Sequence, residues 1–155
     1  MINGIEFVKQ DDHCLLQQPW GYVDIYTEPE GGGPRTSLWH VRRGYYTDMQ
    51  RFIPGPGGPG TTVVAFVISG MGYAIVPPEG FEPKRDGSHT LIPLVIGPQM
   101  LMRVDPQTWF RLHAAGDADL VLFVTEYNWQ GTRMETMEVP NALFGPAKQE
   151  TLRGQ

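Results

Sequence analysis

The side chains best suited to chemistry are four histidines and the tyrosine, aspartate and arginine side chains of one short segment. The histidines are His13, His40, His89 and His113, and no two of them form an HxH pair. Tyr46 and Asp48 lie in RRGYYTDMQR (42–51). A first-row transition metal needs several nitrogen or oxygen ligands converging at about 2 Å. Because the histidines are scattered and the chain has one cysteine, we expect no metal ion and no other cofactor.

The same residues suit proton transfer next to a carbonyl group, which needs a base and an acid on opposite sides of a bound substrate. His113 and His40 are the first candidates for the base, because an imidazole titrates near neutral pH. Tyr46 or Tyr127 would protonate an enolate, and Asp48 would act as a base or orient a histidine. These residue types indicate an isomerase or a cyclase that works without a metal.

A second group of side chains is suited to holding such a substrate. Arginines would donate hydrogen bonds to its oxygens, and aromatic or methionine side chains would form an apolar wall. The candidates are Arg43, Arg103, Trp109, Arg111, Phe66, Met102 and Tyr127. Such walls suit a hydrophobic, polyketide-like molecule. Positioning of the reacting groups alone removes about 7–11 kcal/mol of the reaction barrier in favourable cases, so such a site needs few catalytic groups.

Clusters of glycine, proline and other turn residues divide the chain into short segments. The clusters lie at 28–34, 54–60, 77–87, 97–98, 105–108 and 114–119. The runs between them are rich in β-branched and aromatic residues, at 20–27, 36–43, 61–69, 72–77, 90–97, 99–105, 108–114 and 119–129. Such runs, spaced by about 8–12 residues, are typical of a sandwich or barrel, and no stretch has helical periodicity. The sequence predicts an all-β chain with a buried hairpin at 63–76.

Alternation along one run predicts how its side chains divide between two faces. Successive residues of a strand point in opposite directions, so Trp109, Arg111 and His113 share one face. Phe110 and Leu112 share the other. A tryptophan beside arginine and histidine is poor outer-surface chemistry. We therefore expect the mixed face to line a polar pocket inside the barrel.

The composition of the whole chain limits its partners. Its 155 residues suit one domain spanning 1–155. The net charge of −5 gives no basic face for nucleic acid, and no apolar run approaches the ~20 residues of a membrane span. The N-terminus lacks the pattern of a signal peptide, so we expect a cytoplasmic protein with a small-molecule substrate. Residues 1–30 are expected to exchange strands in a homodimer, and 141–155 to form a peripheral tail.

Two long segments resemble the conserved regions of the cupins, which are double-sheet jelly rolls. VVAFVISGMGYAIVPPEG (63–80) is similar to the first region, and MLMRVDPQTWFRLHAAGDADLVLFVTEYNW (100–129) to the second. The nearest branch is that of the deoxysugar 3,5-epimerases and 3,4-ketoisomerases. Its RG-aromatic-His-x-His run and closing aromatic pair correspond to RGYYTDM (43–49) and TEYNW (125–129). The resemblance spans roughly 36–129 and implies a single-domain cupin jelly-roll β-barrel.

The residues that bind a metal in that family are replaced here. The family's first two histidines match Tyr46 and Asp48, its glutamate matches Val63, and its last histidine matches Arg111. Cupins that use iron, manganese or nickel rely on that His/His/Glu/His set. The resemblance therefore implies a barrel that works without a metal and places Tyr46, Asp48, Arg111 and His113 at its site.

Three hypotheses follow for the function. The first is a metal-independent isomerase or cyclase acting on a carbonyl-bearing molecule, polyketide-like or a deoxysugar, inside the barrel. The second is a non-catalytic cupin that binds a small molecule. The third is a lipocalin-like barrel used for ligand binding or cyclisation.

Overall fold

The computed structural model describes residues 14–27, 33–80, 91–128 and 132–137, together with Gly4 and Glu82. The described residues form eleven strands and no helix. The strands are β1 (Cys14–Gln18), β2 (Gly21–Thr27), β3 (Arg35–Val41), β4 (Met49–Ile53), β5 (Thr62–Ser69), β6 (Gly72–Val76), β7 (Ile92–Ile96), β8 (Leu101–Val104), β9 (Arg111–Ala114), β10 (Leu120–Tyr127) and β11 (Arg133–Met137). The prediction of an all-β chain is confirmed.

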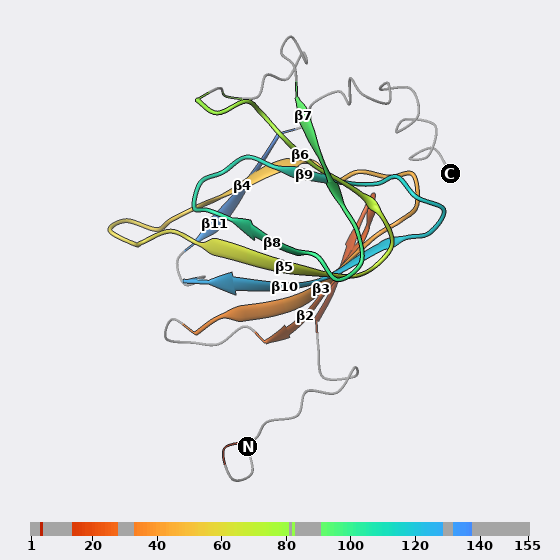
Figure 1. The fold of residues 1–155 in the computed structure, drawn as a ribbon. Helices are drawn as coiled ribbons and strands as arrows, with labels where there is room; N and C mark the ends of the chain where they lie inside the picture. The colour runs from red at the N-terminus through yellow and green to blue at the C-terminus, as the bar shows by residue number, and fades with distance from the viewer. Residues whose placement is uncertain are drawn as a thin grey trace.

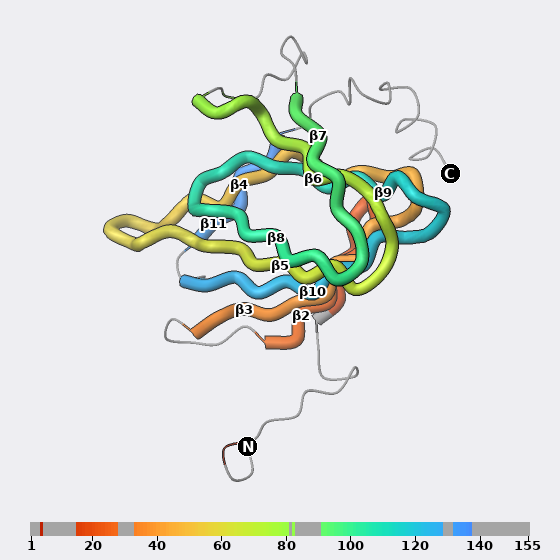
Figure 2. The backbone as a smooth tube through the Cα atoms, in the orientation of Figure 1, coloured from red at the N-terminus to blue at the C-terminus, as the bar shows by residue number. Residues whose placement is uncertain are grey.

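The strands form two layers that enclose a core. One layer is a six-stranded sheet in the order β1-β2-β3-β10-β5-β8. The other contains the sheets β7-β6-β9 and β11-β4, which are linked because Tyr46 bridges to His113 and Gln50 bridges to Phe110. Figure 1 shows β3, β10 and β5 on one side of the molecule and β4, β6 and β9 on the other. The tube in Figure 2 follows the same rolled path.

The segment 63–76 forms two strands, as predicted, but the expected hairpin is wrong. β5 pairs with β10 and β8, whereas β6 pairs with β7 and β9, so the two strands belong to different layers. Gly70, with a φ of 85°, forms the corner between them. A side chain there would overlap the carbonyl oxygen of Asp119, so the absence of a Cβ lets the chain cross from one layer to the other.

Gly70→Ala is expected to lower the free energy of unfolding by more than the ~1–3 kcal/mol that positive φ alone costs a non-glycine residue. The added Cβ would also displace the backbone at Asp119. Gly57→Ala is the matched control, because Gly57 has a φ of 71° but open space around its missing Cβ. Urea denaturation of both variants measures the difference. Equal losses in the two variants would contradict the corner assignment.

Three strands lie outside the runs predicted from the sequence. The sequences of β1 (CLLQQ) and β4 (MQRFI) show no clear alternation of apolar and polar residues. The sequence of β11 (RMETM) mixes charged residues with methionine. β4 and β11 pair with each other and close the second layer. Long-range pairing rather than local pattern determines β4 and β11, since a short polar segment carries little strand preference of its own.

The inner faces of the two layers form one large apolar core. Its buried members are Trp20, Val23, Ile25, Trp39, Val41, Tyr45, Phe52, Val63, Ala65, Val67, Ala74, Ile96, Val104, Phe110, Leu112, Ala114, Leu120, Leu122 and Val124. Phe110 and Leu112 therefore face the interior of the barrel. Because neighbours on a strand alternate, Trp109, Arg111 and His113 face away from that interior, on the outer side of the second layer.

Two expectations about the ends of the chain concern mostly residues outside the described part. The tail 141–155 and most of 1–13 lie there. Residues 14–18 pair with residues 21–27, which also pair with β3 of the same chain. The homodimer stays a prediction, in which β1 and β8, the outer strands of the six-stranded sheet, would meet a partner.

No helix long and apolar enough for a membrane span occurs in the described part of the chain.

Candidate functional site

A cavity of about 170 Å³ lies between the two layers at the end of the barrel where β1, β2, β3, β4, β10 and β11 meet. It is lined by Leu16, Gln18, Trp20, Val23, Arg35, Trp39, Asp48, Gln50, Phe52, Glu126, Met134 and Thr136. Leu16 and Met134 are exposed and stand at its mouth, whereas the tryptophans are buried. We call this cavity the inner pocket. It joins a mostly apolar wall to a few polar groups, the usual composition of a small-molecule site.

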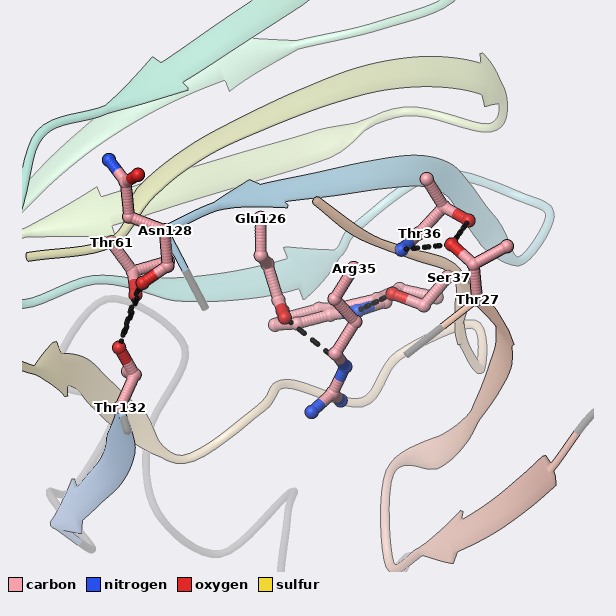
Figure 3. Close-up of polar contacts among 9 residues, drawn as sticks. Thr27, Arg35, Thr36, Ser37, Thr61, Glu126, Asn128 and Thr132 are labelled. Atoms are coloured by element: carbon pink, nitrogen blue, oxygen red, sulfur yellow. Dashed lines mark hydrogen bonds and ion pairs between the residues drawn. The ribbon is translucent and has the colours of Figure 1, made fainter. Parts of the chain in front are cut away.

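An ion pair forms one polar side of the inner pocket. Arg35 of β3 and Glu126 of β10 are directly opposite in the strand register, and Arg35 Nε lies 3.2 Å from Glu126 Oε2. Figure 3 shows the two side chains meeting between their strands. The glutamate side chain is 0% exposed and the arginine 12%. Burial of both charges is tolerated because each compensates the other.

The opposite layer supplies a carboxylate and an amide. Asp48 and Gln50 both line the inner pocket, two residues apart at the start of β4. The Gln50 side chain is buried, and among the described residues its amide nitrogen, Nε2, has no hydrogen-bond partner. A buried amide without a partner costs free energy. Gln50 therefore holds a donor ready for a ligand in the inner pocket.

An irregularity in the strand directs these side chains inward. Tyr46 bridges to His113 and Gln50 to Phe110, so three residues between the bridges on one side oppose two on the other. One extra residue therefore lies between the two bridges, as in a β-bulge. The Thr47 hydroxyl fills the gap, accepting from the Leu112 amide at 3.0 Å and donating to the Asp48 carbonyl at 3.1 Å. The bulge reverses the alternation, so that Tyr46 points outward and Gln50 inward.

Aromatic rings form the apolar wall of the inner pocket. The Trp20 and Trp39 rings lie 6.2 Å apart and are tilted by 37°. The Trp39 indole donates to Ser37 Oγ at 3.0 Å, which fixes its orientation. Phe52 continues the wall from β4 and contacts Phe110 at 6.4 Å. These contacts make the wall rigid, because each ring is held by a partner on another strand or by a hydrogen bond.

Three of the residues predicted for the site cluster together, but on the other side of the second layer. The Arg111 guanidinium lies 4.5 Å from the centre of the Tyr46 ring, and the Tyr46 and His113 rings are 6.0 Å apart. All three side chains are buried. None of them lines the inner pocket. We expected the face that carries Trp109, Arg111 and His113 to line a polar pocket inside the barrel. That expectation is wrong, because the opposite, apolar face of β9 points to the interior.

Trp109 lies on the same outer side, with Met49, Ile75 and Leu91. Its indole nitrogen donates to Glu82 at 2.6 Å, and the Arg51 guanidinium lies 4.6 Å from its ring centre. These contacts explain the burial of a tryptophan outside the barrel's core.

His40 and Arg43 converge on one aspartate outside the barrel. His40 Nε2 lies 2.7 Å from Asp119 Oδ2, and its ring stacks on Tyr22 at 4.6 Å. The Arg43 backbone N–H donates to Asp119 Oδ1 at 2.7 Å. The hydrogen bond from His40, followed by that from Arg43, holds the pKa of Asp119 below its ordinary value of 3.8. His40 and Arg43 thus tie a turn to β3 and do not line the inner pocket.

Asp119→Asn is expected to lower the free energy of unfolding at pH 7 by about 0.2–1 kcal/mol, because solvent screens this half-exposed pair. A lowered pKa stabilises the fold above pH 3.8, and that stabilisation is lost as the pH falls through the folded-state pKa. The variant should therefore show a flatter dependence of Tm on pH below about pH 5. Asp117→Asn, an exposed aspartate of the same turn, is the control. A variant curve parallel to the wild-type curve would contradict the assignment.

The remaining predicted binding residues divide between the surface and the core. Phe66 and Tyr127 are 41% and 46% exposed and point outward from the six-stranded sheet. Arg103 is 70% exposed and pairs with Asp105 at 3.0 Å. Met102 points inward and packs against the large core, away from the inner pocket. Phe66, Tyr127 and Arg103 were expected to line the barrel, and their exposure shows that this expectation is wrong.

The side chains in the described part of the chain do not suit the metal that the cupin resemblance implies for other members. Within that part, no three histidine, cysteine, aspartate or glutamate side chains are grouped so that they could hold an ion. His13 and His89 lie outside the described residues. At the inner pocket the two carboxylates, Asp48 and Glu126, come from opposite layers, and the second is already paired with Arg35.

The residues that sequence reasoning missed are Arg35, Gln50, Glu126 and the tryptophan pair. One signal for Glu126 was present in the sequence. Leu120, Leu122 and Val124 form an apolar alternating face, and Glu126 continues that face with a charge. A charged residue at the end of an otherwise apolar face indicates a buried partner or a ligand. Gln50 had no comparable signal, because the bulge that turns it inward depends on pairing with β9.

Comparisons with known proteins place the fold. No family model matches the sequence, and no curated protein matches it. The capsular polysaccharide assembling protein CapF from Staphylococcus aureus matches with a TM-score of 0.59 at 11% identity, over 82% of this chain and 34% of that one. This chain thus spans about a third of the length of the CapF chain.

Two further structures agree with that match. A vicilin from Capsicum annuum matches with a TM-score of 0.64 at 10% identity, over 83% of this chain and 34% of its own. A Klebsiella pneumoniae protein with a double-stranded β-helix domain matches with a TM-score of 0.54 at 11% identity, over 74% and 82% of the two chains. Identities this low show the fold alone. The chain has a double-stranded β-helix fold, the fold that its sequence resemblance to the cupins implied.

Proposed function

We propose that this chain is an isomerase that moves a proton on a small carbonyl compound bound in the inner pocket. The observation that carries the proposal is the pair formed by Asp48 and Gln50 on one wall. A carboxylate can remove a proton, and two residues further along the chain a buried amide offers an N–H that has no hydrogen-bond partner among the described residues. Proton abstraction next to a carbonyl needs these two groups side by side, because the reacting carbon and the oxygen are neighbours in the substrate.

The proton and the charge move between named atoms in this scheme. A carboxylate oxygen of Asp48 takes the proton from the carbon next to the carbonyl and becomes a carboxylic acid. Electrons from the broken C–H bond move to the carbonyl oxygen, which becomes an enolate oxygen. Gln50 Nε2 donates a hydrogen bond to that oxygen as its charge develops. The proton then returns from Asp48 to another carbon of the same delocalised system, which gives an isomer and restores the carboxylate.

The rest of the inner pocket has supporting roles in the scheme. Glu126 holds Arg35 through the 3.2 Å contact, so Arg35 is a fixed cation in the lining of the inner pocket. Trp20, Trp39 and Phe52 exclude water from the reacting atoms. Fixed donors in a dry pocket stabilise a developing negative charge better than water does, because they need no reorientation during the step.

Proton exchange on 2-tetralone in D₂O tests the proposed function. The wild-type protein is expected to replace protons next to the carbonyl with deuterium faster than buffer does, as followed by proton NMR. The reason is that removing the proton is the first step of the proposed isomerisation. Saturable binding of 2-tetralone without faster exchange would favour the non-catalytic, ligand-binding cupin instead.

A further inference from the structure

We infer that the inner pocket selects a neutral, flat, carbonyl-bearing ring and rejects anionic substrates of similar shape, such as those built on a nucleoside diphosphate. This inference concerns the ligand class and rests on the proposed function only in taking the inner pocket as its site. It separates two substrate classes that the sequence left open, a polyketide-like molecule and a deoxysugar on a nucleotide.

The charges that line the inner pocket disfavour an anion. Arg35 is the one cation among its described lining residues, and Glu126 compensates it at 3.2 Å. Asp48 adds a second carboxylate. The remaining polar lining residues are the uncharged Gln18, Gln50 and Thr136. The lining thus carries a net charge of −1, and an anion entering it would lose its hydration while facing a like charge.

The arginines that a diphosphate would need lie elsewhere. Recognition of phosphate depends on arginine or lysine donors that are free to form charge-assisted hydrogen bonds. Arg43 and Arg103 are on the surface, each in contact with the turn or aspartate beside it. Arg111 is buried over Tyr46 on the far side of the second layer. The described lining of the inner pocket therefore offers no uncompensated cation to a diphosphate.

The shape and the donor of the inner pocket suit a flat carbonyl compound. Trp20 and Trp39 present two ring faces tilted by 37°, which favour contact with a planar, apolar ring. Gln50 Nε2 is an N–H donor without a partner among the described residues, and a carbonyl oxygen is the neutral group that accepts from it. A saturated sugar would leave the aromatic wall poorly covered.

Benzamide, benzoate and benzamidine test the inference, because they share one ring and one shape and differ in charge. Benzamide has no carbon-bound proton next to its carbonyl group, so its binding does not depend on the proposed reaction. Quenching of tryptophan fluorescence, confirmed by calorimetry, measures each Kd. We expect benzamide to bind at least about tenfold more tightly than benzoate. Asp48→Asn should lower the ratio of the benzoate Kd to the benzamide Kd, because it removes one negative charge from the lining.

Asp105→Asn is the matched control, because it removes the same charge from an exposed site and should leave the ratio unchanged. Gln50→Leu should weaken benzamide by about tenfold, because the amide donor is lost. Benzoate binding as tightly as benzamide would overturn the inference, as would benzamidine binding tenfold more tightly than benzamide. Absence of binding by all three would overturn the inference, whereas tight binding of benzamide without proton exchange on 2-tetralone would count against the proposed function alone.

Discussion

Asp48→Asn is expected to slow proton exchange on bound 2-tetralone by about 10²–10⁴-fold, the usual contribution of a positioned base. Asparagine keeps the size of the side chain and its place at the bulge, but it cannot accept the proton. Gln50→Leu should slow exchange by about 10²–10³-fold, because it removes one donor to the developing oxyanion. Proton NMR in D₂O at saturating ketone measures both rates.

Benzamide affinity separates chemistry from binding in that experiment. The Asp48→Asn variant should bind benzamide about as well as the wild type does. The hydrogen bond to the benzamide carbonyl oxygen comes from Gln50 and not from residue 48. Asp105→Asn changes an exposed aspartate and should exchange protons at the wild-type rate. An Asp48→Asn variant that keeps the wild-type exchange rate would remove Asp48 from the proposed mechanism.

Glu126→Gln is expected to cost about 3–5 kcal/mol of the free energy of unfolding, because it removes a buried negative charge that lies 3.2 Å from the mostly buried Arg35 guanidinium. Glutamine has nearly the same volume, so loss of packing contributes little. The double variant Arg35→Met with Glu126→Leu should recover most of this loss, since an apolar pair of similar size needs no compensation. Urea denaturation of Arg35→Met, of Glu126→Leu and of the double variant gives the coupling energy between the two residues.

The exposed pair of Arg103 and Asp105 provides the control for this ion pair. Asp105→Asn should change stability by less than about 1 kcal/mol, because solvent screens a pair that is 70% and 69% exposed. A loss of similar size in Glu126→Gln would mean that the ion pair contributes as little as a surface pair. The inner pocket would then lack the rigid polar side on which the proposed positioning of Arg35 depends.

Several features of the fold were predictable because they depend on neighbouring residues in the chain. Turns follow from glycine and proline, and strands follow from runs of β-branched and aromatic residues between them. The division of Trp109, Arg111 and His113 from Phe110 and Leu112 also followed from alternation and is confirmed by the core. The resemblance of two long segments to cupins correctly predicted the rolled, two-layered fold.

The sequence by itself determined eight of the eleven described strands, the turns between them and which of their side chains share a face. Alternation divides the residues of a strand between two faces but does not specify which face is buried. Only the packing of the two layers against each other decided which face points inward. Pairing between β3 and β10 brought Arg35 to Glu126, and a bulge opposite β9 turned Gln50 into the inner pocket. Both depend on contacts between segments far apart in the chain. Of the candidate catalytic residues named from the sequence, Asp48 alone lines the inner pocket, whereas Tyr46, His40 and His113 do not.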